Sequence, residues 1–310
     1  MVVALGGNAL APPGARATIH DQFRHTRESL GSIVALARAG WRVALTHGNG
    51  PQVGDELLRN ELAAHLLPEN PLGVLVAATE GWIGYMVQQS LRNALDRAGV
   101  RRKVVTVVTQ VIVDPDAAET RTPSKFIGRA LDETQAERLR AAGWTVARDS
   151  RGGFRRVVPS PIPLELVERD VIRDLLDRDV IVVAAGGGGA PVYRHRTLGL
   201  EGIDAVVDKD RAAALLAREI AADVLLILTD VDAVYRGFGT DRAEPIRRLR
   251  VHEAETLLAD GTIGGAGEGS MTPKVEAAVR FVREGGGRAV IARLDEGLEA
   301  LQGERGTEIA

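Results

Sequence analysis

Lysine is the residue type whose placement in this 310-residue sequence says most about its chemistry. Of the 39 Lys and Arg residues, only four are lysines: Lys103, Lys125, Lys209 and Lys274. Lys209 and Lys274 each fall in the first turn of an expected helix, where a cation opposes the helix dipole by about 0.3–1 kcal/mol unless an anion neutralises it. This placement predicts that the two ammonium groups converge on one anionic ligand.

The residues around these two lysines are typical of helix starts. Lys209 lies between Asp208 and Asp210 at the beginning of an alanine-rich run, and either aspartate is a suitable N-cap. Before Lys274, Thr272 is a suitable N-cap and Pro273 suits the first helical position. The sequence therefore predicts a helix N-terminus beside each ammonium group.

Glycine-rich turns follow, or nearly follow, several expected strands. They are Gly6-Gly7-Asn8, Gly48-Asn49-Gly50, the four glycines at 186–189, and residues 264–269. Glycine lets the backbone approach a ligand and direct several N–H groups at one anion, and a following helix adds its positive end. One such turn alone could be an ordinary tight turn, but four of them in one chain indicate a phosphate-rich ligand.

Two common nucleotide-binding motifs do not account for these turns. The P-loop pattern G-x-x-x-x-G-K-[ST] is absent. Gly48, Gly50 and Gly54 loosely follow a strand as in a dinucleotide-binding fingerprint, but Val53 occupies the position where the third glycine is required. A different phosphate-binding scaffold is expected.

Other chemistries are excluded or disfavoured by composition. The sequence has no cysteine, which excludes disulfides, thiolate metal sites and thiol nucleophiles. The six histidines show no H-E-x-x-H spacing, and no G-x-S-x-G elbow is present, so neither a protein-held metal nor a serine hydrolase is expected. A net charge of −3 and a pI of about 6.1 provide no basic field for nucleic acid.

Short β-rich runs alternate with amphipathic runs of helical length, which predicts an α/β fold: a three-layer αβα sandwich with a mostly parallel central sheet. The expected strands are 2–5, 42–46, 104–113, 180–185, 224–229 and 288–292. The expected helices are 21–39, 50–66, 79–98, 165–176, 211–222 and 273–284. The C-terminal edge of such a sheet is where open α/β folds bind ligands, which makes Asp230, after the most apolar strand, a candidate ligand contact.

The segment 114–163 interrupts this alternation. It contains five prolines and mixed charge, and a single helix is expected in it, at 132–142. We expect a small protruding subdomain that acts as a lid. Apolar runs elsewhere are strand-sized, whereas a membrane span needs about 20 residues, and no leader pattern opens the chain, so a cytoplasmic location is expected.

Together these motifs resemble those of carbamate kinases, within the amino-acid kinase family. The matching runs are ALGGNA at 4–9, THGNGPQVG at 46–54, VVPSP at 157–161, GGGGAPV at 186–192, DKD at 208–210 and GSMTPKVEAA at 269–278. They extend in order over essentially the whole chain. Ala4 stands where related acetylglutamate kinases usually carry lysine, which makes the resemblance specific.

The resemblance implies phosphoryl transfer between ATP and carbamate, giving ADP and carbamoyl phosphate, with Mg²⁺. It implies that Lys209, Lys274, Asp210 and Lys125 are catalytic: the first two neutralise the transferring phosphates, Asp210 orients them, and Lys125 reaches in from the lid. Substrate and phosphate contacts are implied for Gly6, Gly7, Asn8, Gly48, Asn49, Gly50, Gly187 and Gly188. Nucleotide contacts are implied for Asp230, Tyr235, Ser270, Met271 and Pro273.

The resemblance also implies how the chain is organised. One domain over 1–310 would comprise a carbamate-binding lobe (1–113 with 164–200), a lid (114–163) and a nucleotide-binding lobe (201–310), and the chain would form a homodimer. Another carboxylate kinase of the same fold remains an alternative, as does a non-catalytic nucleotide or metabolite sensor.

Overall fold

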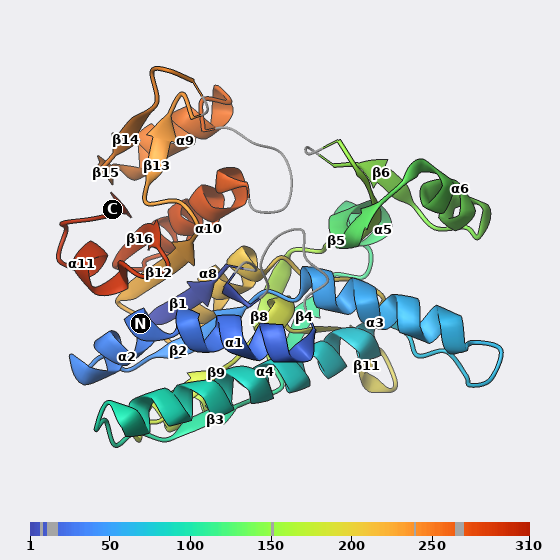
Figure 1. Cartoon of the computed structure of the whole chain (residues 1–310), viewed down its shortest axis with the longest axis horizontal. Coiled ribbons are helices and arrows are strands. Elements are labelled where there is room, and N and C mark those ends of the chain that lie inside the picture. The colour runs from blue at the N-terminus through green and yellow to red at the C-terminus, as the bar shows by residue number, and fades with distance from the viewer. Residues whose placement is uncertain (7–8, 11–17, 150–151, 239, 264–269) are drawn as a thin grey trace.

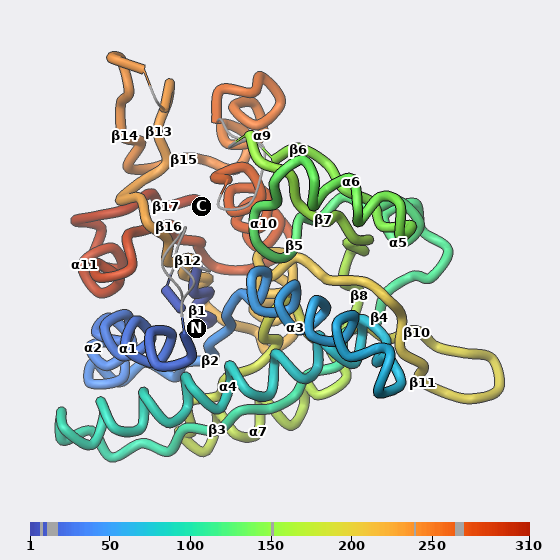
Figure 2. Tube along the Cα trace, turned by 45° about the vertical axis from the view of Figure 1, so that its right-hand side comes forward, coloured from blue at the N-terminus to red at the C-terminus, as the bar shows by residue number. Residues whose placement is uncertain are grey.

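The computed structural model describes residues 1–6, 9–10, 18–149, 152–238, 240–263 and 270–310. Its main body has a central sheet with helices on both faces, and described residues between Ala118 and Pro159 form a smaller unit that projects from this body (Figures 1 and 2). The predicted αβα sandwich with a protruding subdomain is therefore confirmed.

The central sheet has eight strands within the described residues. They are β1 (Val2–Leu5), β2 (Ala44–His47), β3 (Val104–Thr106), β9 (Ile181–Val183), β12 (Val224–Thr229), β15 (Arg248–Leu249), β16 (Arg288–Arg293) and β17 (Thr307–Ile309). Their order across the sheet is β15-β17-β16-β12-β1-β2-β9-β3, and every neighbouring pair is parallel except β16 with β17. The carboxyl ends of β1, β2, β9 and β12 thus meet at one edge.

The helices pack on the central sheet, on one another or within the protruding subdomain. They are α1 (Ile19–Ser29), α2 (Gly31–Arg38), α3 (Gly50–Ala63), α4 (Leu72–Arg97), α5 (Ala118–Arg121), α6 (Glu133–Ala141), α7 (Arg169–Asp177), α8 (Lys209–Glu219), α9 (Val251–Ala259), α10 (Met271–Arg283) and α11 (Gly297–Leu301). Along β1, Val2 and Ala4 enter the core beneath α7, α8 and α10, whereas Val3 and Leu5 enter the core beneath α2 and α4. This alternation is what a strand buried on both faces requires.

Smaller sheets lie beside the central one. They contain β4 (Gln110–Val113), β8 (Pro163–Leu166), β10 (Ala190–His195) and β11 (Gly199–Gly202); β13 (Val234–Arg236) and β14 (Glu244–Ile246); and, in the protruding subdomain, β5 (Pro123–Leu131), β6 (Val146–Arg148) and β7 (Phe154–Pro159). The subdomain packs on α3, where a Cβ added to Gly54 would lie 2.0 Å from the Gly128 Cα. Only glycine permits this approach of two backbones.

Several predicted boundaries were wrong. The single strand expected at 104–113 is two strands in different sheets, because the chain turns at 107–109, where the Thr109 hydroxyl donates to the Val107 carbonyl (2.9 Å). Apolar periodicity does not reveal such a change of sheet. The helix expected at 21–39 is divided at Leu30 into α1 and α2, and part of the helix expected at 165–176 is strand β8.

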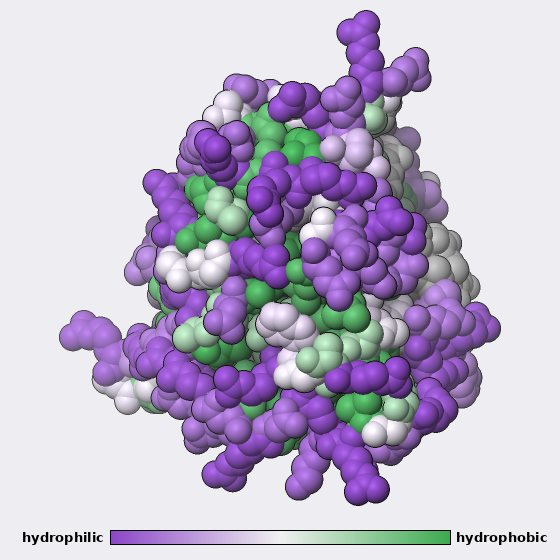
Figure 3. Space-filling view, turned by 90° about the vertical axis from the view of Figure 1, so that its left-hand side faces the viewer, coloured by the Kyte–Doolittle hydropathy of each residue, from purple (hydrophilic) through white to green (hydrophobic). Residues whose placement is uncertain are grey.

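One face of the molecule has a mixed polar and apolar surface. On the face shown in Figure 3, hydrophobic residues lie among hydrophilic ones that extend outward around them. Within the described part of the chain, no helix combines the length and the apolar composition needed to span a membrane.

Candidate active site

The start of α8 positions two of the predicted residues. Asp208 is its N-cap, and Oδ1 of that side chain accepts hydrogen bonds from the backbone N–H groups of Asp210 (2.9 Å) and Arg211 (3.3 Å). Lys209 is the first helical residue, and its Nζ lies 2.6 Å from Asp210 Oδ1. Asp210 is only 3% exposed, so this ion pair is largely removed from water.

The start of α10 differs from the prediction. Ser270, not Thr272, is the N-cap, and the helix begins at Met271 rather than at Pro273. The Ser270 hydroxyl accepts from the Thr272 N–H (3.3 Å), while the Thr272 hydroxyl donates to the Ile263 carbonyl (3.2 Å) and is therefore used elsewhere. Lys274 still lies in the N-terminal part of the helix.

Lys274 contacts the same carboxylate as Lys209, that of Asp210. Its side chain is 4% exposed, and its Nζ lies 3.6 Å from Asp210 Oδ2 and 3.3 Å from the Ser270 carbonyl oxygen. Burial lowers the pKa of Lys274, and the nearby Lys209 lowers it further, against the opposing effect of Asp210. The two ammonium groups thus share one buried carboxylate, and an added anion would stabilise both.

The protruding subdomain supplies a third ammonium group. Lys125, on β5, lies with its Nζ 2.7 Å from Asp208 Oδ2. Burial alone would raise the pKa of Asp208, but the Lys125 ammonium and then Lys209 hold it well below its usual range, so the carboxylate is ionised. We refer to Lys125, Asp208, Lys209, Asp210 and Lys274 as the lysine cluster; it combines three cations with two anions.

The role of Asp208 as partner of Lys125 was missed from the sequence, which indicated only a cap. A capping aspartate uses one oxygen for the helix amides and leaves the second for another donor. The available signal was a helix-capping aspartate next to a lysine, at the edge of the sheet where ligand binding was predicted.

The glycine turns lie around the lysine cluster as far as they are described. Gly186–Gly188 forms a 3-10 turn after β9, and a Cβ on Gly188 would lie 2.3 Å from the Val207 carbonyl oxygen, immediately before Asp208. Gly48, Asn49 and Gly50 are buried at the start of α3. Gly6 donates its N–H to the Leu228 carbonyl (2.9 Å), whereas Gly7, Asn8 and residues 264–269 lie outside the described residues.

The predicted nucleotide contacts are less closely grouped. Ser270, Met271 and Pro273 lie at the start of α10 beside Lys274, and Asp230 follows β12 on the surface. Tyr235 lies on β13 and donates its hydroxyl hydrogen to Asp232 Oδ1 (2.8 Å). Over the ranges that the structure describes, no hydrogen bond or ion pair joins Tyr235 to the lysine cluster.

The donor set fits a polyphosphate better than a metal held by the protein alone. Among the described residues there is no group of three His, Asp or Glu side chains suited to a metal ion. Asp208 and Asp210 are both engaged by lysines. Mg²⁺ is usually held by one or two carboxylates, waters and substrate phosphates, which this arrangement allows.

Comparison with known proteins identifies the family. The model of the amino acid kinase family matches residues 1–293. The chain belongs to the amino acid kinase family. Similar relatives include carbamate kinases from Pyrococcus horikoshii (43% identical, covering 100% of this chain and 98% of the relative) and Halobacterium salinarum (45%, covering 99% and 97%).

Solved structures agree with this membership. Carbamate kinase from Giardia lamblia bound to citric acid superposes with a TM-score of 0.92 at 39% identity, over 99% of this chain and 97% of that one. The same enzyme bound to AMP-PNP gives a TM-score of 0.89 at 38% identity, again over 99% and 97%. These relatives therefore match this chain over nearly its whole length, including the protruding subdomain.

Proposed function

We propose that this chain is a carbamate kinase that transfers a phosphoryl group reversibly between ATP and carbamate, giving ADP and carbamoyl phosphate. The observation that carries the proposal is the contact of Lys209 and Lys274 with one buried carboxylate, Asp210, from the starts of two helices. Full-length similarity to carbamate kinases supports the choice of carbamate as acceptor.

The proposed chemistry requires alignment and charge neutralisation rather than a general base. Carbamate is already an anion, so its oxygen attacks the γ-phosphorus of ATP without first losing a proton, and the bond to the β,γ-bridging oxygen breaks. Lys209 and Lys274 stabilise the charge on the phosphoryl oxygens, and Asp210 holds both ammonium groups in place. Lys125 brings a third positive charge from the subdomain.

His47 fits this absence of a general base because its low pKa makes the imidazole a weak base. Burial lowers its pKa to about 4, with the Gly48 carbonyl opposing the shift. The ring is therefore neutral at pH 7, and its Nδ1 lies 3.0 Å from the Gly48 carbonyl oxygen. Because a carbonyl only accepts, Nδ1 carries the proton.

The substrates are assigned to three regions of one domain. Residues 1–113 and 164–200 would bind carbamate, 201–310 the nucleotide, and 114–163 would act as the lid. We assign phosphate and substrate contacts to Gly6, Gly7, Asn8, Gly48, Asn49, Gly50, Gly187 and Gly188, and nucleotide contacts to Asp230, Tyr235, Ser270, Met271 and Pro273. Mg²⁺ would be held mainly by nucleotide phosphates and would neutralise part of their charge.

A cytoplasmic homodimer is part of the proposal. Both substrates are small intracellular metabolites, and the family resemblance implies the dimer. Sedimentation of the purified chain tests the dimer directly.

Synthesis of ATP is the decisive test of the activity. The purified chain is incubated with ADP, Mg²⁺ and carbamoyl phosphate, and ATP is measured against a reaction without protein. ATP formation that EDTA abolishes is expected. Failure to form ATP, or equally fast formation from acetyl phosphate, would contradict the proposed acceptor.

A further inference from the structure

A buried carboxyl group lies behind the glycine turn that borders the lysine cluster. Glu80, on α4, is 1% exposed, and its Oε1 accepts hydrogen bonds from the N–H groups of Thr109 and Gly186, each at 3.1 Å. One oxygen thus joins the end of the β3–β4 connection to the turn after β9. The proposed reaction does not use this side chain.

The turn that Glu80 holds is strained and needs such support. Ala185, immediately before it, has φ 50, a left-handed conformation that costs a residue with a Cβ about 1–2 kcal/mol. Its N–H donates to the Thr109 hydroxyl oxygen (2.9 Å), and its carbonyl accepts from the Thr46 hydroxyl (2.8 Å). Buried side chains from neighbouring elements therefore impose this backbone conformation.

The same turn packs closely against His47 and against Asn49, a proposed substrate contact. A Cβ on Gly186 would lie 2.3 Å from His47 Nε2, and one on Gly187 would lie 2.3 Å from the Asn49 side chain. A Cβ on Gly188 would overlap the carbonyl of Val207, the residue before the lysine cluster's Asp208. A shift of the turn would therefore move the carbamate end of the site relative to the lysines.

The charge state of Glu80 follows from its surroundings. Both amides reach Oε1, while Oε2 is buried and has no hydrogen-bond partner among the described residues. Burial raises the pKa of Glu80 well above its usual range, although the Thr109 and Gly186 amides oppose this. These surroundings favour the neutral acid, whose proton would be on Oε2 because Oε1 accepts both amides.

We propose that Glu80 is a positioning residue for the carbamate end of the reaction, which fixes the Gly186–Gly188 turn through the carboxyl oxygen that accepts the Thr109 and Gly186 amides. This inference rests on the proposed function for the identity of the substrate. It predicts that shortening the side chain impairs carbamoyl phosphate binding and leaves nucleotide binding almost unchanged, because the assigned nucleotide contacts lie at the start of α10, after β12 and on β13.

Glu80→Asp is the principal test. The shorter side chain withdraws the acceptor oxygen from both amides, and we expect KM for carbamoyl phosphate to rise at least tenfold while KM for ADP stays within about threefold. Equal changes in the two KM values would overturn the proposal, since they indicate general damage to the fold. Unchanged values of both would overturn it as well.

Two further variants distinguish the loss of the Glu80 hydrogen bonds from a change in its charge and from a general effect of substitutions on α4. Glu80→Gln keeps a carbonyl oxygen on a neutral group of the same length, so it should retain more than a third of the parent kcat/KM; a loss as large as that of Glu80→Asp would overturn the proposed role of the acceptor oxygen. Gln88→Ala is the matched control, because Gln88 also lies on α4 and accepts a backbone N–H, that of Thr106 (2.7 Å), away from the turn. It should leave the ratio of the two KM values unchanged.

Hydrogen exchange provides a readout that does not need turnover. In Glu80→Asp, amides of 185–189 should exchange at least tenfold faster than in the parent, while Glu80→Gln retains the parent protection; unchanged protection in Glu80→Asp would overturn the proposal. If Glu80→Asp does not fold, Gly186→Ala disturbs the same turn through His47 and should show the same KM ratio, and an unchanged ratio would count against the turn. A parent that forms no ATP refutes the proposed function instead, a result that is obtained before any variant is measured.

Discussion

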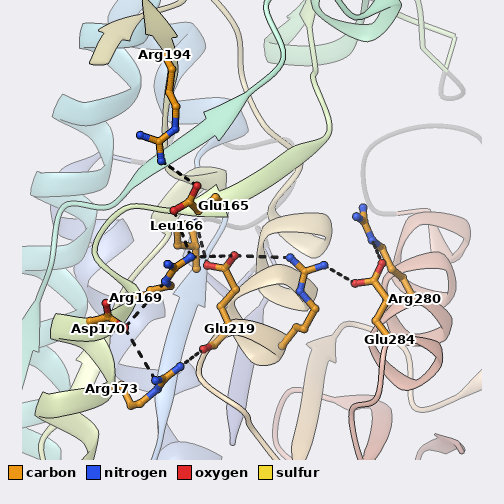
Figure 4. A network of polar contacts seen from close by, with 10 residues as sticks. Glu165, Leu166, Arg169, Asp170, Arg173, Arg194, Glu219, Arg280 and Glu284 are labelled. Atoms are coloured by element: carbon orange, nitrogen blue, oxygen red, sulfur yellow. Dashed lines mark hydrogen bonds and ion pairs between the residues drawn. The ribbon is translucent and has the colours of Figure 1, made fainter. Parts of the chain in front are cut away.

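The two ends of α8 carry ionic groups in very different surroundings. At its N-terminus, the lysine cluster buries Asp210 and Lys274 to 4% side-chain exposure. At its C-terminus, Arg218 and Glu219 join a network that runs over α7, β8 and α10 (Figure 4). Glu219 itself is 9% exposed, but its partners Arg169 and Arg218 are 40% and 33% exposed and remain in contact with water.

Burial, rather than the number of charges, distinguishes these two ends. Arg218, at the C-terminal end, also suits the helix dipole, whereas Lys209 at the N-terminus opposes it. Exposed ion pairs are screened by water and contribute about 0–1 kcal/mol each. A buried excess of positive charge is costly without an anion, and this favours the N-terminal end of α8 as the proposed phosphate site.

The largest expected effect is the loss of a lysine from the buried end. Lys209→Ala should lower kcat by about 10²–10³, because one electrostatic contact to the phosphoryl group is removed. Steady-state kinetics of ATP formation measure this, with circular dichroism to verify folding. Lys103→Ala is the matched control, since Lys103 is exposed and lies outside the cluster. Turnover close to that of the parent in a folded Lys209→Ala protein would refute the assigned role.

Acid should weaken the fold through a buried group beside the same site. The folded-state pKa of His47 is about 4, below the ordinary value of 6.5, so the unfolded chain binds its proton first as the pH falls. Stability from this group is complete above pH 6.5 and is lost towards pH 4, by about 2 kcal/mol at pH 4.5. Urea unfolding of parent and His47→Gln at pH 7 and 4.5 isolates this contribution from that of other groups. An identical pH dependence in both proteins would contradict it.

An intermediate effect is expected where the cluster meets the protruding subdomain. Lys125 is 21% exposed, so its charge is more screened than that of Lys274. Lys125→Ala should lower kcat/KM about tenfold, and the ratio to the parent should shrink as NaCl is raised. A loss as large as that of Lys209→Ala, independent of salt, would show that partial exposure does not weaken this contact.

The smallest effect is expected at the exposed end. Arg194, which is 65% exposed, pairs with Glu165 at 3.0 Å. Arg194→Ala should change the free energy of unfolding by less than about 1 kcal/mol and leave kcat unaltered. Urea unfolding and kinetics check both quantities. A drop in kcat would mean that the two ends of α8 are coupled rather than independent.

Much of the arrangement could be predicted from local signals. The runs at 2–5 and 224–229 are strands within those bounds because their residues, apart from the last one, Thr229, are apolar and are buried on both faces. Of the two aspartates predicted as a possible cap, Asp208 is the cap, and the helix begins at Lys209 rather than at residue 211, so the predicted cation in the first turn is present. The strand at 104–113 was not predictable as two, because its two halves have the same apolar character and differ only in their partners.

The sequence by itself determined the alternation of strands and helices, the glycine turns and the rationing of lysine, since each depends on residues near one another in the chain. Only the tertiary structure decided that Lys125 reaches Asp208 and that the Glu80 carboxyl joins Thr109 to Gly186. These contacts join residues that are distant in sequence, and their partners depend on how the sheet brings strand ends together. Local propensities carry no information about which strand ends lie next to each other.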